Sequence, residues 1–287
     1  MTTTAGTAPV HDPERLAAIS RRGRRDFTIS AVSTVVVLGV LVLVILNSPG
    51  WPAIRESFFD RELAEESLPH ILEGLRLTVI LFVTAEPVIL VIGLVLAVVR
   101  GLRTPVFTPL RFLAAAYTDI VRGIPTILLV LMFGFGIPAL NLQGLPDSQL
   151  FWGWFALVVS YSAYVAEVLR AGLESVHPSQ RAAARALGLN EFQSLRFVVV
   201  PQAVRRVVPP LLNDFIALQK DTALVAILGA GIEMTRAAQI DAFTSFDYTP
   251  FVVAAFFYVL LTVPLSRYAD WIAERRRRRS QAGQDVL

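Results

Sequence analysis

The sequence predicts an all-α membrane protein with about six transmembrane helices, and three observations lead to this class. Hydrophobic residues make up 54% of the 287 residues, and the mean hydropathy of +0.58 exceeds what one soluble core requires. Apolar runs of about 20 residues, the length that crosses a bilayer, recur along the chain. The basic residues gather in alternate polar segments between these runs.

The first apolar run, residues 27–46, follows a polar tail formed by residues 1–26. A cleaved signal peptide is the alternative to a retained span. The run is longer than a usual signal core, and no clear small-x-small cleavage site follows it. We therefore interpret it as a retained span, which leads into an acidic loop formed by residues 47–69.

The remaining spans are predicted within residues 70–272, with no tandem repeat and no separate soluble domain. They cover residues 71–99, 112–137, 151–169, 207–230 and 251–271. The run at 207–230 is the least apolar of the five. Residues 273–287 form an Arg-rich tail.

The basic residues orient these spans. With the N-terminus inside, 20 of the 26 Lys and Arg residues lie in inside segments and three lie in outside loops. The inside segments are residues 1–26, 100–111, 170–206 and 267–287. This positive-inside bias predicts a multi-pass protein with both termini in the cytoplasm. The five arginines of residues 275–279 directly follow a span, so they are interpreted as a lipid-facing anchor and not as a nucleic-acid patch.

The composition excludes several kinds of chemistry. The chain has no cysteine, and its three histidines, His11, His70 and His177, have no metal-ligand spacing. It has no phosphate-binding G-x-x-x-x-G-K-[ST], no H-E-x-x-H and no G-x-S-x-G. We therefore expect no catalytic residues, no metal and no cofactor, and any uphill transport must draw its energy from a partner.

Residues 170–206 form a polar, Arg-rich segment between apolar runs. Pro178 suits a first helical turn, and Gly188 suits the left-handed residue that ends a helix. Asn190 with Gln193 predicts a capping box for a second helix. The first helix offers a small surface made of Ala182, Ala183, Ala184 and Ala186. From the residues alone, this is an ordinary solvated helical hairpin.

The alanines, Gly188, Val198, Val200 and Pro201 keep the spacing of the EAA loop, EAA---G---------I-LP. The segment thus resembles the cytoplasmic loop of permease subunits in ABC importers, and is most similar to the polar amino-acid type (histidine, glutamine or arginine). Ala182 stands where that motif has Glu. Supporting stretches are residues 117–125, YTDIVRGIP; 163–170, AYVAEVLR; 201–203, PQA; and 213–222, NDFIALQKDT.

The resemblance covers roughly residues 70–270 and implies a five-helix permease core plus one extra N-terminal helix in a bacterial cytoplasmic membrane. It implies ABC ATPase subunits that hold ATP and Mg, an extracytoplasmic solute-binding protein, a second permease subunit in a homo- or heterodimer, and an amino-acid-like substrate. Transport then follows by alternating access. The residues it assigns to ATPase coupling are Ala182, Ala183, Ala184, Gly188, Leu189 and Pro201.

Charged and amide side chains within spans are candidate substrate contacts, because their burial in a bilayer is costly. They are Glu86, Asp119, Arg122, Asn213, Lys220 and Asp221. Structural roles are the open alternative to substrate contact for these residues. In that interpretation Asp119 forms an ion pair with Arg122, Lys220 forms one with Asp221, and Asp214 is solvated at the cytoplasmic end of its span. Tyr161, Tyr164 and Glu167 are interpreted as packing and hinge residues.

Two other functions compete with a permease subunit. An ion-coupled secondary transporter would show paired inverted repeats around broken helices, and we detect none. A non-transporting membrane scaffold or sensor leaves the charges within the spans unexplained.

Overall fold

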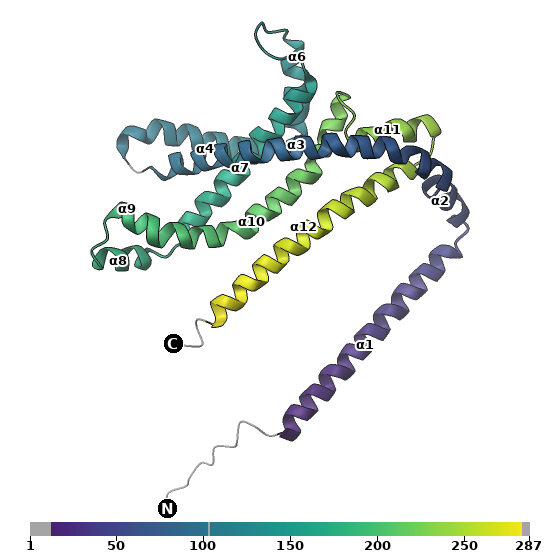
Figure 1. The fold of residues 1–287 in the computed structure, drawn as a ribbon, viewed down its shortest axis with the longest axis horizontal. Helices are drawn as coiled ribbons and strands as arrows, with labels where there is room; N and C mark the ends of the chain where they lie inside the picture. The colour runs from purple at the N-terminus through teal and green to yellow at the C-terminus, as the bar shows by residue number, and fades with distance from the viewer. Residues whose placement is uncertain (1–12, 103, 283–287) are drawn as a thin grey trace, which may run out of the picture. The chain divides into compact units, whose positions relative to one another are not determined.

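The structure is a computed structural model that describes the backbone of residues 13–102 and 104–282 and the side chains of residues 26–102 and 104–275. It divides into two units, residues 1–57 and residues 58–287, each described by itself. Every regular element in the described residues is helical (Figure 1), which confirms the all-α class. Several basic side chains used for the orientation, those of residues 15–25 and 276–279, lie outside the described range.

The first unit contains the long helix α1, Pro13–Leu46. Its candidate span, Asp26–Leu46, matches the predicted run at 27–46, and its described side chains are all exposed. A helix that is apolar all round suits lipid as its surroundings. The helix begins at Pro13, so it extends into the segment expected as a polar tail. Helix α2, Trp51–Phe58, then occupies much of the expected loop at 47–69.

Helix α3, Arg61–Gly101, opens the second unit and covers the predicted span at 71–99. It begins ten residues early because the Asp60 side chain accepts a hydrogen bond from the Leu63 backbone N–H and caps the helix. The last helix, α12, Thr249–Ala282, covers the predicted span at 251–271.

The predicted span at 112–137 consists of two helical limbs with a break between them. Helix α4, Thr108–Gly123, is followed by α5, Thr126–Leu131, a π-helical turn, Met132–Gly136, and α6, Ile137–Ala139. The two limbs are bent by 103°, and Figure 1 shows α6 pointing away from α4. Pro125 has no N–H and forces the preceding residue out of the helical region, so Ile124 is extended (φ −98°, ψ 128°).

Helix α7, Gln149–Glu174, is the centre of this unit and contains the predicted span at 151–169. Helices α3, α4, α5 and α10 all pack against it. Its span is 56% buried, against 17% for the span in α12. Its fully buried side chains include Ala156, Leu157 and Ala163. The buried polar side chains of α7, Ser160 and Ser162, therefore face other helices and not lipid.

The predicted span at 207–230 consists of α10, Val200–Asp221, and a 3-10 helix, Thr222–Leu228. In the described residues, four helical segments are long and apolar enough to cross a membrane, or five if the bent pair counts as one span. Helix α10 is not among them, since it carries Arg205, Arg206, Asp214, Lys220 and Asp221. The count of about six spans therefore stays a prediction.

Helix α11, Met234–Ser245, lies against α3 and α12 in the loop predicted to be outside. Its approach to α3 requires a glycine at position 74. A Cβ atom on Gly74 would lie 2.8 Å from the backbone N and Cα atoms of Met234. The buried N-terminus of α11 is thereby fixed against the middle of α3.

Candidate functional site

The loop between α7 and α10 has the helix, glycine turn and second helix that the sequence predicts. Helix α8, Pro178–Ala186, begins with a proline, and the ring of His177 accepts a hydrogen bond from the Ser179 backbone N–H at 3.2 Å. Helix α9, Glu191–Ser194, then continues through a π-helical turn, Leu195–Val199, into α10.

The turn between α8 and α9 is closed by backbone and side-chain hydrogen bonds. Gly188 has φ +82°, its N–H donates to the Arg185 carbonyl, and the Leu189 N–H donates to the Ala184 carbonyl. This pair of bonds is the Schellman pattern that a left-handed glycine allows. Asn190 and Gln193 form the reciprocal capping box. The local geometry of the loop is therefore confirmed.

The outer surface of the loop differs from the predicted alanine surface. Ala182 and Ala183 are exposed, but Ala184 is 3% exposed and packs inward, so it is removed from the expected outer face. Leu187 is 83% exposed, and Phe192 and Phe197 are also exposed. The sequence interpretation missed these large apolar side chains, although their place beside a glycine turn was a usable signal. The loop thus presents an apolar surface to a partner.

The loop is attached to the helices on either side. Arg181 of α8 donates to the Leu173 carbonyl of α7 at 3.4 Å, and Arg206 of α10 donates to the Ser175 carbonyl. Beneath the loop, Val176, Val199 and Ala203 form a small buried cluster. These contacts attach α8 and α10 to the end of α7.

Two predicted pathway residues, Glu86 and Arg122, lie near Asp214 between α3, α4 and α10. Glu86 and Arg122 both lie within electrostatic range of Asp214. Phe82, one turn before Glu86, packs edge-on against Phe215 with ring centroids 4.4 Å apart, which holds α3 to α10 at this level. The Oδ2 atom of Asp214 is buried and has no hydrogen-bond partner in the described residues. A polar cluster of both charges thus lies between these helices.

The suggested pairing of Lys220 with Asp221 is not what the structure has. The Tyr161 hydroxyl donates to Asp221 Oδ2 at 2.8 Å, which ties α7 to α10. Lys220 is exposed, and no ion pair joins it to Asp221 among the described residues. Adjacent residues on a helix point in directions about 100° apart, so they do not face each other. Asn213, seven residues earlier, is exposed like Lys220 and shares its face of α10.

The suggested pairing of Asp119 with Arg122 is also wrong. Asp119 is exposed, and Arg122 instead lies 3.7 Å from Glu167 of α7 and 5.8 Å from the centroid of the Tyr164 ring. Glu167 also binds Arg100 and Arg170. Glu167 and Tyr164 were expected to be packing and hinge residues, so their contacts with a pathway arginine were missed.

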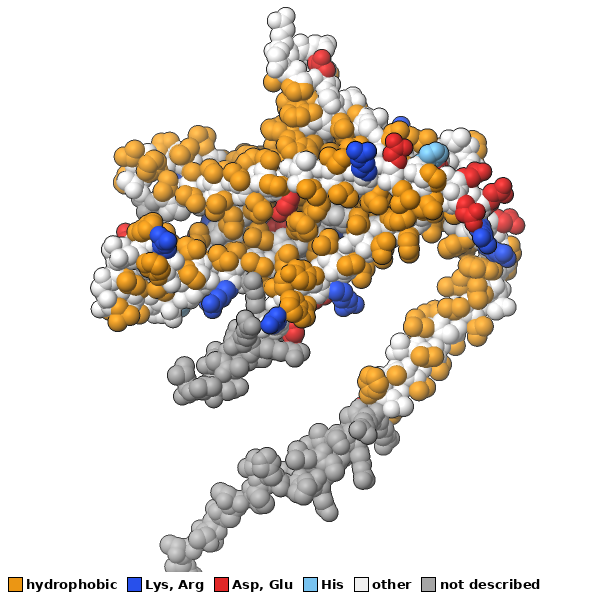
Figure 2. All heavy atoms as spheres, viewed as in Figure 1, with side chains coloured by type: hydrophobic (Ala, Val, Ile, Leu, Met, Phe, Trp, Pro, Cys, Tyr) orange, Lys and Arg blue, Asp and Glu red, His pale blue; other side chains and the backbone are white. Residues whose placement is uncertain are grey.

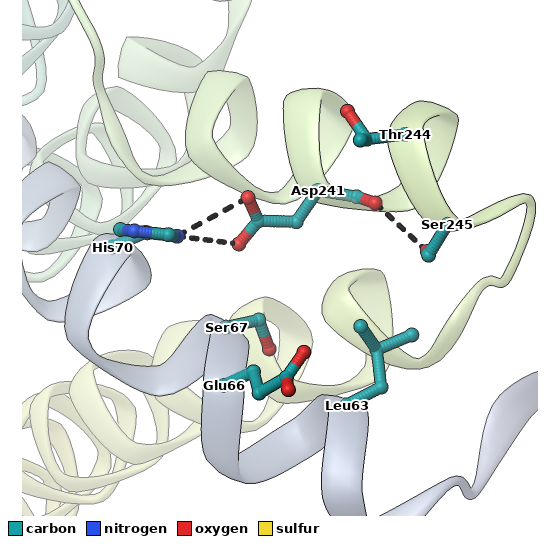
Figure 3. A pocket seen from close by; sticks show the side chains of 7 residues that line it. All are labelled: Leu63, Glu66, Ser67, His70, Asp241, Thr244 and Ser245. Carbon is teal, nitrogen blue, oxygen red and sulfur yellow. Dashed lines mark hydrogen bonds and ion pairs between the residues drawn. The ribbon is translucent and has the colours of Figure 1, made fainter.

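A separate notch opens between α3 and α11, at the end of the unit predicted to lie outside. It has a volume of about 200 Å³ and is lined by Leu63, Glu66, Ser67, His70, Asp241, Thr244 and Ser245. His70 and Asp241 point toward each other across it at 3.1 Å (Figure 3). None of the predicted pathway residues lines this notch. In the described residues no cluster of His, Asp or Glu has a geometry suited to a metal ion.

Charge is distributed unevenly over the second unit. Figure 2 shows acidic side chains gathered where α3 begins and basic side chains over α8 to α10 and the later part of α12. Hydrophobic side chains cover most of the surface between these regions (Figure 2). This is the pattern that a positive-inside orientation produces, with the helical loop on the basic side.

Comparison with known proteins identifies the family. Residues 89–278 match the family described as "Binding-protein-dependent transport system inner membrane component". The chain belongs to this family. It is similar to the arginine transport system permease protein ArtQ of Bacillus subtilis, with 34% identity over 69% of this chain and 89% of ArtQ. It is also similar to the glutamate/aspartate import permease protein GltK of Escherichia coli, with 32% identity over 76% of this chain and 98% of GltK.

A solved structure supports the same assignment within the binding-protein-dependent family. It is described as an amino acid ABC transporter with histidines, and the two chains share 30% identity and a TM-score of 0.68. The match covers 75% of this chain and 98% of the other. The part of this chain that matches the family, residues 89–278, includes the helical loop, Arg122 and Asp214.

Proposed function

We propose that the chain is the membrane-spanning permease subunit of an ATP-driven ABC importer that moves a polar amino acid or a related zwitterion across the cytoplasmic membrane. Its membership of the binding-protein-dependent transport family carries this proposal. The names of its relatives, which import arginine or glutamate and aspartate, supply the substrate class. An ion-coupled transporter or a membrane scaffold fits this membership less well.

The chain itself performs no bond chemistry in this proposal. ATP and Mg are held by ATPase subunits that dock on the exposed surface of α8 and α9, through Ala182, Ala183, Leu187 and Phe192. Gly188 shapes this surface, while Ala184, Leu189 and Pro201 support it. A solute-binding protein delivers the substrate from outside, and a second permease subunit completes the pathway. The apolar exposed loop supports such docking, since exposed apolar surface of this kind marks protein interfaces.

The substrate passes the polar residues of α3, α4 and α10. A zwitterion needs both an anionic and a cationic partner in a dehydrated site. Glu86 and Asp214 offer carboxylates, and Arg122 offers a guanidinium near Asp214. Asp119, Asn213 and Lys220 are exposed in the single chain, where a second subunit can meet them.

The test is uptake into liposomes that contain the chain with its ATPase subunits and binding protein. L-arginine, L-glutamine and L-glutamate are offered in turn, with ATP inside the liposomes. We expect uptake of at least one of them, and it should stop without ATP and continue after ion gradients are collapsed. Uptake that follows an imposed ion gradient without ATP would instead support a secondary transporter, and absence of uptake in all arms would support a scaffold.

A further inference from the structure

Glu167 of α7 is the centre of an ionic cluster that joins three helices. Its Oε2 atom lies 3.0 Å from Arg100 Nη1 of α3 and 3.7 Å from Arg122 Nη1 of α4. On its own helix, Arg170 donates through Nε to Oε2 at 3.1 Å and through Nη2 to Oε1 at 2.6 Å. Three guanidinium groups therefore share one carboxylate.

The three arginines are not equivalent. Arg170 is local to α7, binds both oxygens of Glu167, and is itself held by Glu174 at 2.5 Å. Such a two-bond contact fixes the orientation of the carboxylate. Arg100 comes from α3, its side chain is 13% exposed, and it makes one charge-assisted hydrogen bond. Arg122 is the most loosely held, with the longest contact and a side chain that is 37% exposed.

The residues of the cluster lie next to the break in α4 and close to the helical loop. Arg122 is followed directly by the break at residues 123–125, where α4 and α5 are bent by 103°. Glu167 lies on the part of α7 that leads into α8, and Arg181 and Arg206 attach that loop to α7. The carboxylate is thus a direct ionic link between the helix that carries the loop and the helix that breaks beside the polar cluster, in addition to the hydrogen bond from the Tyr117 hydroxyl of α4 to the Val159 carbonyl of α7.

We propose that Glu167 is a positioning residue for transport, which transmits displacement of α8 to the break in α4 through Arg122 and to the end of α3 through Arg100. The inference rests on the proposed function. A neutral side chain at position 167 leaves three arginines close together with Glu174 as the remaining carboxylate of the cluster. Repulsion then moves Arg100 and Arg122 away from α7, because like charges in a partly buried site repel strongly.

The experiment compares Glu167→Gln with Glu174→Gln in the complete reconstituted transporter. Glu174 is the matched control, because it is on the same helix and contacts Arg170 but neither α3 nor α4. The probe is whichever of L-arginine, L-glutamine and L-glutamate the unmodified transporter takes up fastest. We expect Glu167→Gln to lower the amount taken up per ATP hydrolysed by about tenfold or more, since it loses two charge-assisted contacts between helices. The ratio for Glu174→Gln should stay within about twofold of the unmodified protein.

Further measurements separate transmission from simple folding. The ATPase rate should change by less than about twofold in Glu167→Gln, because the docking surface is not altered. Glu167→Asp should recover part of the lost ratio. If Glu167→Gln does not reach the membrane, Arg100→Gln and Arg122→Gln replace it, and each should lower the same ratio. Arg100→Gln is the decisive variant of the two, because Arg122 is also a proposed substrate contact.

Two outcomes are decisive against the inference. Equal ratios in Glu167→Gln and Glu174→Gln would overturn it, as would full coupling in both Arg100→Gln and Arg122→Gln. Failure of the proposed function is distinguishable from these, because the unmodified complex would then show no ATP-dependent uptake at all.

Discussion

At the scale of single residues, Lys220 and Asp221 show how adjacent charges acquire different roles. Asp221 is held by the Tyr161 hydroxyl inside the helix packing, whereas Lys220 is exposed. Lys220 is also the single lysine among 26 basic residues. An ammonium group on a flexible stem can follow a moving carboxylate more readily than a planar guanidinium. Lys220 therefore suits a substrate contact, and Asp221 suits a structural one.

We predict that Lys220→Met reaches the membrane at the level of the unmodified protein but loses uptake. Asp221→Asn should lower thermal stability, because the hydrogen bond from Tyr161 loses its charge-assisted part, worth about 1 kcal/mol. Unfolding of the two single variants and the double variant in detergent gives the coupling energy between the sites. That energy should be below about 0.5 kcal/mol, as for independent sites.

Tyr161→Phe is the matched control, since it removes the same hydrogen bond from the other side. It should couple strongly to Asp221→Asn. Recovery of uptake in the Lys220→Met, Asp221→Asn double variant would contradict this view. It would support an ion pair between Lys220 and Asp221 instead.

Glu167 shows why part of the site could not be predicted. Its spacing to Arg170 and Glu174 is visible in the sequence as local pairs three and four residues apart. Its contacts with Arg100 and Arg122 depend on how α3 and α4 pack on α7, across separations of 67 and 45 residues in the chain. Patterns within a helix do not contain that information.

At the scale of elements, the start of α11 depends on one buried carboxylate. Glu233 is 1% exposed, and its Oε1 atom accepts from the Arg236 backbone N–H at 2.7 Å. Its Oε2 atom accepts from Thr78 of α3 and Tyr258 of α12, both at 3.4 Å. Burial raises the pKa of Glu233 above its usual value of 4.5, although these hydrogen bonds oppose the shift. Three helices are thus joined at one buried carboxyl group whose pKa is raised by its burial.

The raised pKa of Glu233 determines whether the free energy of unfolding rises or falls with pH. The folded state binds the proton more tightly than the unfolded state, so the free energy of unfolding falls as the pH rises from about 4.5 through the raised pKa. Glu233→Gln removes this dependence and should match or exceed the unmodified protein at pH 8. Glu233→Ala should cost about 1–3 kcal/mol at every pH, because Thr78, Tyr258 and the backbone donor lose their acceptor.

The measurement is thermal unfolding in detergent at pH 5 and pH 8, with Glu62→Gln on the exposed first turn of α3 as the control. The unmodified protein should lose stability relative to Glu233→Gln between pH 5 and pH 8. A gain in stability over this range would contradict the raised pKa of Glu233.

Elements governed by local rules were predicted well, and those governed by packing were not. The helix at Pro178, the left-handed Gly188 and the Asn190 cap follow from residues within one turn of each other. The break after Gly123 also had a local signal in Pro125, but its angle is set by the surrounding helices. Helix α10 was placed among the spans although it carries five charged residues. Its burial depends on neighbours and, in the proposed function, on a second subunit.

At the scale of the whole molecule, the two ends of the second unit differ in charge, and the difference predicts which end lies in the cytoplasm. The loop between α7 and α10 and the end of α12 are rich in arginine, whereas the start of α3 is acidic (Figure 2). Anionic lipids and the translocation machinery retain such arginine-rich segments on the cytoplasmic side. This orientation predicts that the notch lined by His70 and Asp241 (Figure 3) lies on the outer side. Family membership does not by itself decide this orientation.

We predict that single cysteines report the orientation directly, since the chain has none of its own. Gln143→Cys before α7 and Thr244→Cys on α11 are at exposed positions, as is Leu187→Cys in the loop after α8. In intact cells an impermeant maleimide should modify the first two within minutes and leave the third unmodified. Opening the cells should make Leu187→Cys reactive, because its position is 83% exposed. Labelling of Leu187→Cys in intact cells, with protection of the other two, would place the loop outside and remove the ATPase from its proposed docking surface.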